Sequence, residues 1–317
     1  MSLGEFDIIA KYFAGHAHGD EVLLGIGDDA AVLGARADRR LVLAMDTIVE
    51  GVHFLPDADA ADIGYRVLAV NLSDLAAMGA VPSWMSLSLS LPRADERWLT
   101  GFASGLFELA RRYDVQLIGG DTVKGPLVIT IQVGGWVEPE RWLERSGARE
   151  GDAIFVSGTL GDAAAGLALL TGEPRPMKDA SSQFLRNRFL RPEPRIALGR
   201  ALRSVATAAM DISDGLLTDL GKLCEASRCG ALLEVEAVPT SQPLQTTFDV
   251  EARLQHSLCG GDDYELLFTA PAAAIAALET AAAITQIGVI TSGSGVECRR
   301  AGQPFTPQRT GYDHFAH

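Results

Sequence analysis

The sequence predicts an α/β protein with two domains. At 317 residues, the chain is longer than one compact core of ordinary size. Segments with the spacing of strands and segments with the spacing of helices alternate along the chain. A polar turn at residues 145–152 separates two strand-like runs, so we expect domains at residues 1–144 and 145–317.

The first domain contains elements of both kinds. Apolar residues recur at helical spacing in three segments: residues 5–13, 62–78 and 94–113. Short apolar or alternating runs predict three strands: residues 41–45, 85–91 and 127–137. In residues 85–91, Met85 and three leucines alternate strictly with three serines. This strand therefore has one apolar face and one uncharged polar face, which suggests that its serine face packs against something polar.

The second domain repeats this style. We expect five strands: residues 153–156, 208–211, 232–235, 264–269 and 284–290. We expect three helices, the last of them rich in alanine: residues 162–170, 216–227 and 271–282. Residues 171–182 contain Gly172, Pro174 and Pro176 and are predicted to form a surface loop. The sequence shows no repeat of fixed period.

The charge and cysteine content exclude several classes of protein. With 27 basic and 41 acidic side chains, the net charge is −14, and such a surface repels nucleic acid and anionic lipid. The four cysteines form no Cys-x-x-Cys pair and are too sparse for a disulfide scaffold. The first residues do not form a signal peptide, and no apolar stretch reaches the ~18 residues of a membrane span. We therefore expect a cytoplasmic protein that binds neither nucleic acid nor membranes.

Aspartates lie where solvated surface charges are uncommon. They follow glycine turns, end predicted strands or interrupt an apolar helix face: Asp28, Asp29, Asp46, Asp74, Asp121, Asp211, Asp214, Asp262 and Asp263. Few basic residues are adjacent in the sequence, and a buried carboxylate is costly unless it is paired or binds a metal. Oxygen ligands without a histidine or cysteine set are typical of Mg²⁺ bound together with substrate phosphates. A protein that binds magnesium and phosphate is therefore favoured.

Each aspartate also has a structural interpretation. An aspartate beside glycine is commonly a turn residue or a helix cap, and Asp214 can cap the helix at residues 216–227. Asp74 differs, because a residue in the middle of an apolar helix has no capping role. The number of such positions favours metal binding over capping.

Other nucleotide and catalytic motifs are weak. The P-loop and dinucleotide fingerprints are absent, but three glycine-rich segments can approach phosphates through backbone N–H groups: residues 25–29, 119–121 and 158–162. The sequence shows no recognisable Ser-His-Asp catalytic triad. His16 and His18 are expected to be exposed, and His53 is either structural or a substrate contact near Asp46.

Seven segments together resemble the thiamine-monophosphate kinase family. The longest are GIGDDAAV at residues 25–32, NLSDLAAMGA at residues 71–80 and GGDDYEL at residues 260–266. The others are shorter: residues 45–47 with 50–54, 119–122, 211–216 and 311–315. The resemblance extends from about Gly4 to Phe315 and is highly specific, because the segments are long and occur in order.

The resemblance implies the two-domain fold of aminoimidazole ribonucleotide synthetase and selenophosphate synthetase. In that fold the sheet of the N-terminal α/β domain is shared across a homodimer, and the C-terminal domain is also α/β. The implied reaction transfers the γ-phosphoryl group of ATP directly to thiamine monophosphate and needs several Mg²⁺ ions. The strand at residues 85–91 would suit the shared sheet.

The resemblance also implies residue roles. The metal ligands are Asp29, Asp46, Asp74, Asp121, Asp211, Asp214 and the carbonyl of Met45, which stands where many members have serine or threonine. ATP is contacted by Gly120, Asp121, Arg145 and Ser213. Thiamine monophosphate is contacted by His53, Asp262 and Tyr312, and some members have glutamate in place of Asp262. No general base or covalent nucleophile is expected, because a phosphate acceptor with a second pKa of ~6 is already largely ionised.

Two alternatives remain. Another enzyme of the same fold, such as an aminoimidazole ribonucleotide synthetase, is compatible with the Asp-x-Ser-Asp-Gly motif, although residues 260–266 and 311–315 favour the thiamine enzyme. Selenophosphate synthesis is disfavoured, because the N-terminal glycine-rich region lacks cysteine. A non-catalytic protein that binds metal or nucleotide is the second alternative.

Overall fold

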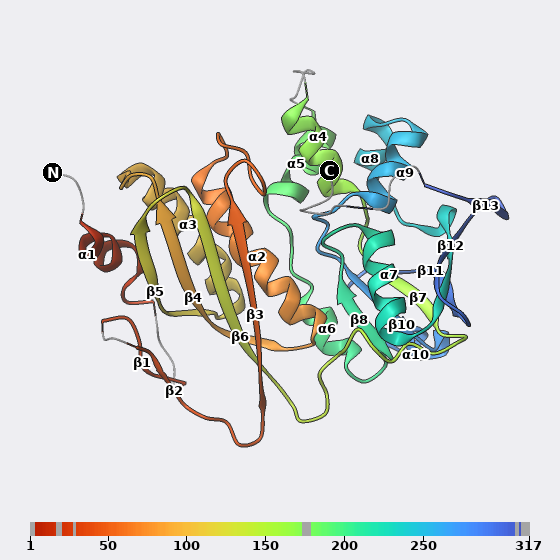
Figure 1. The fold of residues 1–317 in the computed structure, drawn as a ribbon, viewed down its shortest axis with the longest axis horizontal. Coiled ribbons are helices and arrows are strands. Elements are labelled where there is room, and N and C mark those ends of the chain that lie inside the picture. Colours follow the sequence, from red (N-terminus) through yellow and green to blue (C-terminus); the bar gives the residue numbers. More distant parts are fainter. Residues whose placement is uncertain (1–3, 17–20, 28–29, 173–178, 308–310, 312–317) are drawn as a thin grey trace. The chain divides into compact units, whose positions relative to one another are not determined.

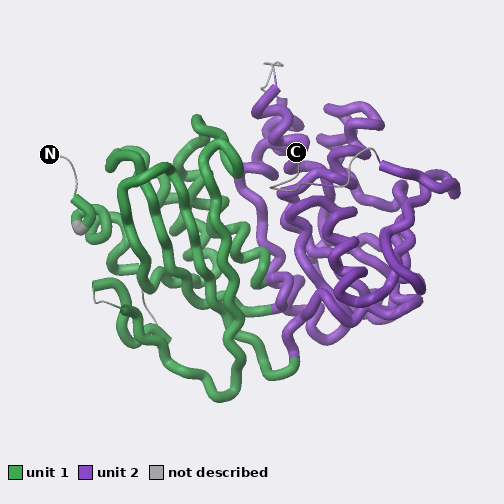
Figure 2. Tube along the Cα trace, in the orientation of Figure 1, with its two compact units in different colours: residues 1–75, 80–140 green, residues 76–79, 141–317 purple. Residues whose placement is uncertain are grey.

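The computed structural model describes residues 4–16, 21–27, 30–172, 179–307 and 311, and the chain forms two compact units (Figures 1 and 2). Unit 1 comprises Met1–Leu75 and Ala80–Glu140, and unit 2 comprises Ala76–Gly79 and Arg141–His317. Each unit mixes helices with a sheet, so the predicted α/β class is confirmed.

Unit 1 consists of a four-stranded sheet, a small hairpin and helices. The strands are β1 (Val22–Leu24), β2 (Val32–Leu33), β3 (Arg40–Val49), β4 (Val81–Leu91), β5 (Gln116–Lys124) and β6 (Val128–Val137). The helical segments are α1 (Glu5–Ile8), the π-helical turn η1 (Ile9–Phe13), α2 (Ala60–Ala77) and α3 (Glu96–Tyr113). The main sheet has the order β3-β6-β4-β5, and only the pair β4–β5 is parallel.

Helices α2 and α3 lie together on one face of this sheet (Figure 1). They approach closely because two glycines stand at the crossing: a side chain at Gly64 would collide with the carbonyl oxygen of Phe102, and one at Gly105 with that of Ala61. Asp95 caps the start of α3 by accepting from the N–H groups of Arg97 and Trp98.

The alternation in β4 is confirmed as two different faces. Met85 and the three leucines are buried, whereas Ser88 is exposed on the opposite face. The strand register aligns this serine face with Leu41, Leu43 and Met45 of β3, whose exposed fractions are 45%, 52% and 62%. The sheet thus presents a second face that carries exposed apolar side chains, which we call the open face.

Unit 2 contains a seven-stranded sheet of order β13-β12-β9-β11-β7-β10-β8. Its strands are β7 (Ala153–Ser157), β8 (Ala208–Asp211), β9 (Gly230–Glu234), β10 (Leu266–Ala270), β11 (Ile284–Thr291), β12 (Gly295–Arg300) and β13 (Gln303–Phe305). Its helices are α4 (Asp162–Thr171), α5 (Ala180–Leu190), α6 (Ile196–Leu202), α7 (Leu216–Ser227), η2 (Val235–Ala237), α8 (Gln242–Thr247), α9 (Val250–Cys259) and α10 (Ala272–Ala276). Only the pair β9–β12 is parallel.

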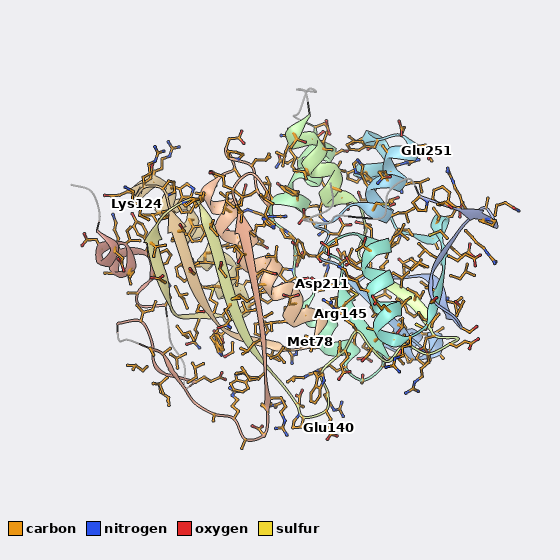
Figure 3. All side chains as sticks on the ribbon, in the orientation of Figure 1. Met78, Lys124, Glu140, Arg145, Asp211 and Glu251 are labelled. Atoms are coloured by element: carbon orange, nitrogen blue, oxygen red, sulfur yellow. The ribbon has the colours of Figure 1, made fainter. Side chains whose placement is uncertain are left out.

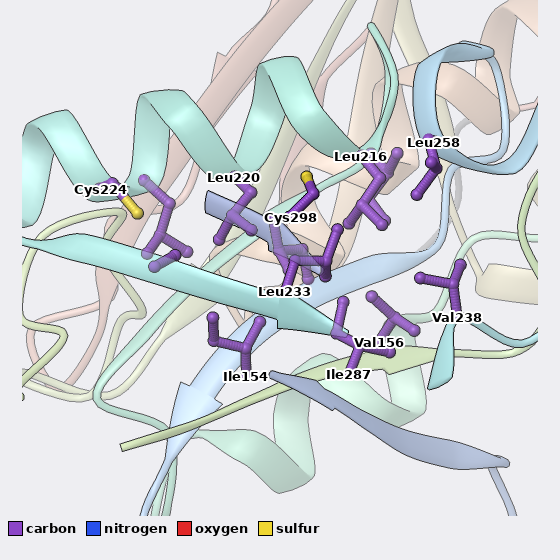
Figure 4. Packing of buried hydrophobic residues seen from close by; sticks show 14 of the residues in the cluster. Ile154, Val156, Leu216, Leu220, Cys224, Leu233, Val238, Leu258, Ile287 and Cys298 are labelled. Atoms are coloured by element: carbon purple, nitrogen blue, oxygen red, sulfur yellow. The ribbon is translucent and has the colours of Figure 1, made fainter. Parts of the chain in front are cut away.

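The core of unit 2 lies between α7 and one face of the sheet (Figure 4). Leu216 and Leu220 of α7 pack with Val156 of β7, Leu233 of β9 and Ile287 of β11. All four cysteines are free thiols and buried. Burial raises the pKa of Cys224 to about 12, so this thiol behaves as an apolar core residue.

The structure differs from the expected elements in several places. The helix predicted at residues 271–282 is reduced to α10, which buries none of its residues, so alanine propensity alone did not extend it. The short helices α5, α6, α8 and α9 and the strands β12 and β13 were not foreseen. Within the predicted loop at residues 171–182, residues 173–178 lie outside the described part of the chain. None of the described helices is both long and apolar enough to cross a membrane.

Candidate active site

In unit 1, strand β3 and helix α2 bring Asp46 and Asp74 toward each other. The sequence had placed Asp46 at the end of a strand, but in the structure Asp46 lies inside β3. Its backbone N–H donates to Oδ1 of Asn71 (2.9 Å), a fully buried residue of α2. Asp74 follows Asn71 by three residues and therefore lies on the same side of the helix. These two predicted metal ligands share one region of unit 1.

Asp121 lies elsewhere in unit 1. Asp46 is in register with Leu87 and Gly120, whereas Asp121 is in register with Ser88, so Asp46 and Asp121 face opposite sides of the sheet. Strands β3 and β5 are also the two edges of this sheet, roughly 14 Å apart at about 4.8 Å per strand spacing. One copy of unit 1 therefore does not bring these two carboxylates to a common point.

The glycines at 119 and 120 do not form the expected turn, because both lie within β5. Gly120 is required there for close approach, since a side chain would collide with the carbonyl oxygen of Leu87 on β4. The register shift between Met85 and Ser86 lies beside the same glycines. The exposed backbone at this point is strand backbone rather than a loop.

A cavity of about 550 Å³ adjoins this part of β5. It is lined by Ile9, Phe13 and Leu117 and by residues 25–27, 30–31 and 119–122. The volume falls within the range of small-ligand sites, and apolar walls beside glycine backbone can hold a flat ring and a phosphate chain. Two of the three predicted glycine segments thus meet at one cavity. Asp28 and Asp29 lie outside the described residues.

His53 lies in the turn after β3, as expected. Its Nδ1 accepts the N–H of Val49 (3.1 Å), and its own N–H donates to the carbonyl of Val49 (2.9 Å). Because Nδ1 is an acceptor, the neutral ring carries its proton on Nε2. The turn therefore orients a single N–H donor.

In unit 2, two motifs that are far apart in sequence lie side by side. The N–H of Asp262 donates to the carbonyl of Ser213, and the N–H of Tyr264 donates to that of Ile212, both at 2.9 Å. The hydroxyl of Tyr264 donates to Oδ1 of Asp262 (3.2 Å). A predicted ATP contact, Ser213, and a predicted substrate contact, Asp262, are thus neighbours.

Of the other predicted residues, Asp211 lies at this end of β8, whereas Arg145 lies toward the strand's other end, where its carbonyl accepts the hydroxyl of Ser227 at the end of α7. Asp211 is the last residue of β8 and is buried. The N–H of Ala209 donates to the carbonyl of Glu144 (2.8 Å), so Arg145 follows a segment paired with β8 (Figure 3). Gly311 packs against Asp214 and Thr218, since a side chain there would collide with both. Tyr312, the next residue, lies outside the described part of the chain.

Sequence reasoning missed a buried carboxylate below this turn. Oδ2 of Asp219 accepts the N–H groups of Ser213 (3.0 Å) and Asp214 (2.9 Å), and the residue is fully buried. Lys222 Nζ donates to Oδ1 of Asp219 (2.8 Å) and to Oδ2 of Asp214 (2.5 Å). Burial raises the pKa of Asp219, and Lys222 opposes that shift. The i,i+3 spacing of Asp219 and Lys222 on a predicted helix was the available signal.

A second buried group also lies outside the predicted set. Asp263 accepts the N–H groups of Gly161 (2.6 Å) and Ala163 (3.2 Å), and burial raises its pKa to about 8 against those bonds. Glu265 is buried, which disfavours its charge, but Arg195 and Arg188 hold its pKa below the usual range. Both residues closely follow Asp262 in the chain.

The donor set fits Mg²⁺ chemically. The predicted ligands in the described chain are carboxylate oxygens and one carbonyl oxygen. The carboxylate of Asp214 already binds one cation, the ammonium group of Lys222. Among the residues that the structure describes, no group of three or more His, Cys, Asp or Glu side chains is arranged to hold a metal by itself. The predicted set is divided between unit 1 and unit 2 and includes Asp29, which is not described.

Comparison with known proteins identifies the family. Residues 27–137 and 149–300 match the N-terminal and C-terminal domains of AIR synthase related protein. The thiamine-monophosphate kinase of Salmonella typhimurium is 47% identical, over 100% of this chain and 99% of the relative. The crystal structure of thiamine-monophosphate kinase from Stenotrophomonas maltophilia K279a is 44% identical, with a TM-score of 0.85 over 96% of this chain and 98% of that one. A second structure, AaThiL complexed with AMPPCP and TMP, is 32% identical, with a TM-score of 0.78 over 98% and 97%. The chain therefore belongs to the thiamine-monophosphate kinase family, within the AIR synthase related proteins.

Proposed function

We propose that this chain transfers the γ-phosphoryl group of ATP to thiamine monophosphate, giving thiamine diphosphate and ADP. The observation that carries the proposal is 47% identity, over the full length, to a thiamine-monophosphate kinase. The geometry of unit 2 supports it, because Ser213 and Asp262 lie side by side and Gly311 packs against Asp214. A relative of the same fold has been solved with AMPPCP and TMP, a nucleotide analogue and a second ligand together.

The proposed roles follow the family motifs. ATP is contacted by Gly120, Asp121, Arg145 and Ser213, of which the first two line the cavity of unit 1. The thiamine monophosphate is contacted by His53, Asp262 and Tyr312. Mg²⁺ is held by Asp29, Asp46, Asp74, Asp121, Asp211, Asp214 and the Met45 carbonyl. When bound, the ions neutralise the charge of the phosphates, a need that is acute in a chain of net charge −14.

The chain's own residues supply position rather than proton transfer. The nucleophile is an oxygen of the acceptor phosphate, which is largely ionised near pH 7 because its second pKa is ~6. His53 offers its Nε2–H as a donor, since its Nδ1 is occupied by the N–H of Val49. Asp262 is oriented by Tyr264, whose hydroxyl donates to it. Both groups would orient the acceptor for in-line attack on the γ-phosphorus.

The transfer is proposed to be direct, without a phosphoenzyme. A covalent route would release ADP before the acceptor binds and would give ping-pong kinetics. The protein is incubated with γ-labelled ATP and Mg²⁺ without acceptor and then denatured. We expect no labelled protein and intersecting initial-rate lines. Stoichiometric label that is chased into thiamine diphosphate would overturn the direct route.

The test of the function itself is a substrate panel. Thiamine monophosphate is compared with thiamine and with a panel of other phosphorylated metabolites. We expect ADP formation that depends on thiamine monophosphate and stops when EDTA removes Mg²⁺. Turnover of another member of the panel at equal or higher efficiency would replace the proposal, and binding without any turnover would favour the non-catalytic alternative.

We further propose a homodimer and a cytoplasmic setting. The dimer is supported by the open face, on which Leu41, Leu43 and Met45 are exposed apolar residues at the edge of a sheet. The four free, buried thiols are compatible with a reducing compartment.

A further inference from the structure

The segment from Gly260 to Glu265 has an unusual backbone. Asp262 and Tyr264 have φ angles of 70° and 51°, in the left-handed region that residues with side chains rarely adopt. Such a conformation persists only where the surroundings enforce it, and it is concentrated at functional sites. Alternate side chains of the segment differ in exposure: Asp262 and Tyr264 are partly exposed, whereas Asp263 and Glu265 are buried.

The two buried side chains anchor the segment in unit 2. Asp263 accepts two N–H groups at the start of α4, from Gly161 and Ala163. Glu265 accepts the hydroxyl of Ser157 at the end of β7 (2.5 Å). The residues that follow Asp262 are therefore fixed by these buried contacts, and the N–H of Asp262 itself donates to the carbonyl of Ser213.

Two arginines complete the anchor. Arg195 donates from Nε and Nη2 to the two carboxylate oxygens of Glu265, a bidentate contact. Arg188 Nη2 donates to Glu265 Oε1 (2.8 Å) and to the carbonyl oxygen of Asp263 (3.4 Å), so it ties both buried residues together. The side chain of Arg188 is only 13% exposed, and that of Arg195 is 24% exposed. The carboxyl group of Asp162 also lies beside this cluster, with its Oδ2 3.9 Å from Arg188 Nε.

The glycine segment at residues 158–162 has its explanation in this cluster. A side chain at Gly158 would collide with the carboxylate of Glu265, and the residue has a positive φ of 58°. One at Gly161 would collide with the backbone of Ser257 and His256. These glycines therefore make room for the buried glutamate and for the packing of α4, which is a different use from the phosphate approach that the sequence had suggested.

We propose that Glu265, Arg188 and Arg195 are positioning residues that hold Asp262 in place to bind the acceptor. The proposal rests on the proposed function, in which Asp262 contacts thiamine monophosphate. If the cluster is weakened, Asp262 and Tyr264 can relax out of the left-handed region, and the carboxylate of Asp262 moves away from the acceptor. Ser213 has a separate support, because its N–H is bonded to Asp219, so ATP binding is expected to change much less.

The test compares Arg195→Gln with the conservative Arg195→Lys and with a matched control, Asp152→Asn. Asp152 is also a buried carboxylate of unit 2 and accepts from Thr207 (2.7 Å) and from the N–H of Arg149 (2.9 Å). It precedes β7, whereas Ser157 ends that strand, about 17 Å away at ~3.3 Å per residue. Its loss should reduce stability without touching the segment.

Three quantities are measured for each variant at a temperature where all are folded: the KM for each substrate, the melting temperature, and the hydrogen exchange of the Asp262 and Tyr264 amides. Arg195→Gln should raise the KM for thiamine monophosphate at least tenfold, change the KM for ATP less than threefold and accelerate exchange of both amides. Arg195→Lys should give an intermediate value, which also serves if the glutamine variant does not fold. Asp152→Asn should lower only the melting temperature.

The positioning role is refuted if Arg195→Gln and Arg195→Lys lower only the melting temperature, as the control does. It is equally refuted if Asp152→Asn raises the same KM and accelerates the same amides, since any loss of stability would then suffice. If the wild-type protein does not turn over thiamine monophosphate, the proposed function fails, but the exchange measurement still decides whether Arg195 fixes the segment.

Discussion

Replacing Leu43 on the open face by glutamate tests the proposed homodimer. Leu43 lies on β3 with 52% of its surface exposed. Burying a whole leucine side chain contributes about 1.5–3 kcal/mol, so covering the exposed half contributes roughly 1 kcal/mol, and twofold symmetry doubles this to about 2 kcal/mol. A buried, unpaired glutamate in each copy costs several kcal/mol more. At 1.4 kcal/mol per factor of ten, we expect the dissociation constant to rise roughly a thousandfold or more.

The assay is light scattering at micromolar concentration. Wild type should have twice the 33.6 kDa chain mass, and Leu43→Glu should have the mass of one chain with an unchanged circular dichroism spectrum. Val250→Glu, at a 47% exposed residue of α9 in unit 2, is the control and should stay dimeric. A monomeric wild type, or a Leu43→Glu variant that remains a dimer, would refute the reasoning. Leu87 and Leu89 are poor probes, because both are buried inside unit 1 and a charge there would disturb its core.

Three further predictions concern the carboxylates. Asp46→Asn should abolish ATP turnover while preserving the melting temperature, because it is the backbone of residue 46 that bonds to Asn71; near-normal activity at ordinary Mg²⁺ would exclude Asp46 as a key ligand. Lys222→Met should tighten Mn²⁺ binding, measured by calorimetry, about tenfold, equal to about 1.4 kcal/mol, because it removes a cation from Asp214. Lys222→Arg keeps the cation and should not tighten binding. Equal or weaker Mn²⁺ binding in the methionine variant would contradict this prediction. Asp263 keeps its proton up to about pH 8 in the folded chain but loses it near 3.8 when unfolded, so its contribution to stability falls as pH rises between those values. Between pH 5 and 7.5, the free energy of unfolding measured with urea should fall with pH more steeply in wild type than in Asp263→Asn, by up to about 1.4 kcal/mol per pH unit. Parallel profiles for the two proteins would show that Asp263 is ionised throughout this range.

The parts of the fold that follow from local pattern were predictable. Helix α7 occupies the predicted residues 216–227, and β4 contains the predicted alternation, because in both cases one periodic face is buried by the unit itself. The helix expected at residues 271–282 failed because its alanines have propensity but no buried face. The turn expected at residues 119–121 failed because glycine also serves close strand packing, and that need depends on Leu87 of a neighbouring strand.

The candidate site was also only partly predictable, because some of its contacts join residues that are distant in sequence. Motif positions identified Ser213 and Asp262, and the structure brings them together. The buried charges that hold those residues were missed, because their partners are distant in sequence: Glu265 pairs with Arg195, 70 residues away, and with Ser157, 108 residues away. Few basic residues are adjacent to the aspartates in the sequence, but Lys222 contacts Asp219 from three residues further along α7, so a basic partner need not be adjacent.

Two carboxylates of unit 2, Glu265 and Asp214, are paired with different cations, and the difference suits the tasks proposed for them. Glu265 is paired with two arginines, whose planar, rigid guanidinium groups fix a carboxylate by bidentate contact and are always charged. Asp214 is paired with a lysine that is 38% exposed, a point charge on a flexible stem. A carboxylate that only holds the chain in place gains from the first arrangement, since any movement would release Asp262. A carboxylate that is to bind a metal gains from the second, since the lysine can move into solvent when the metal arrives, at the modest energetic cost of a partly exposed ion pair.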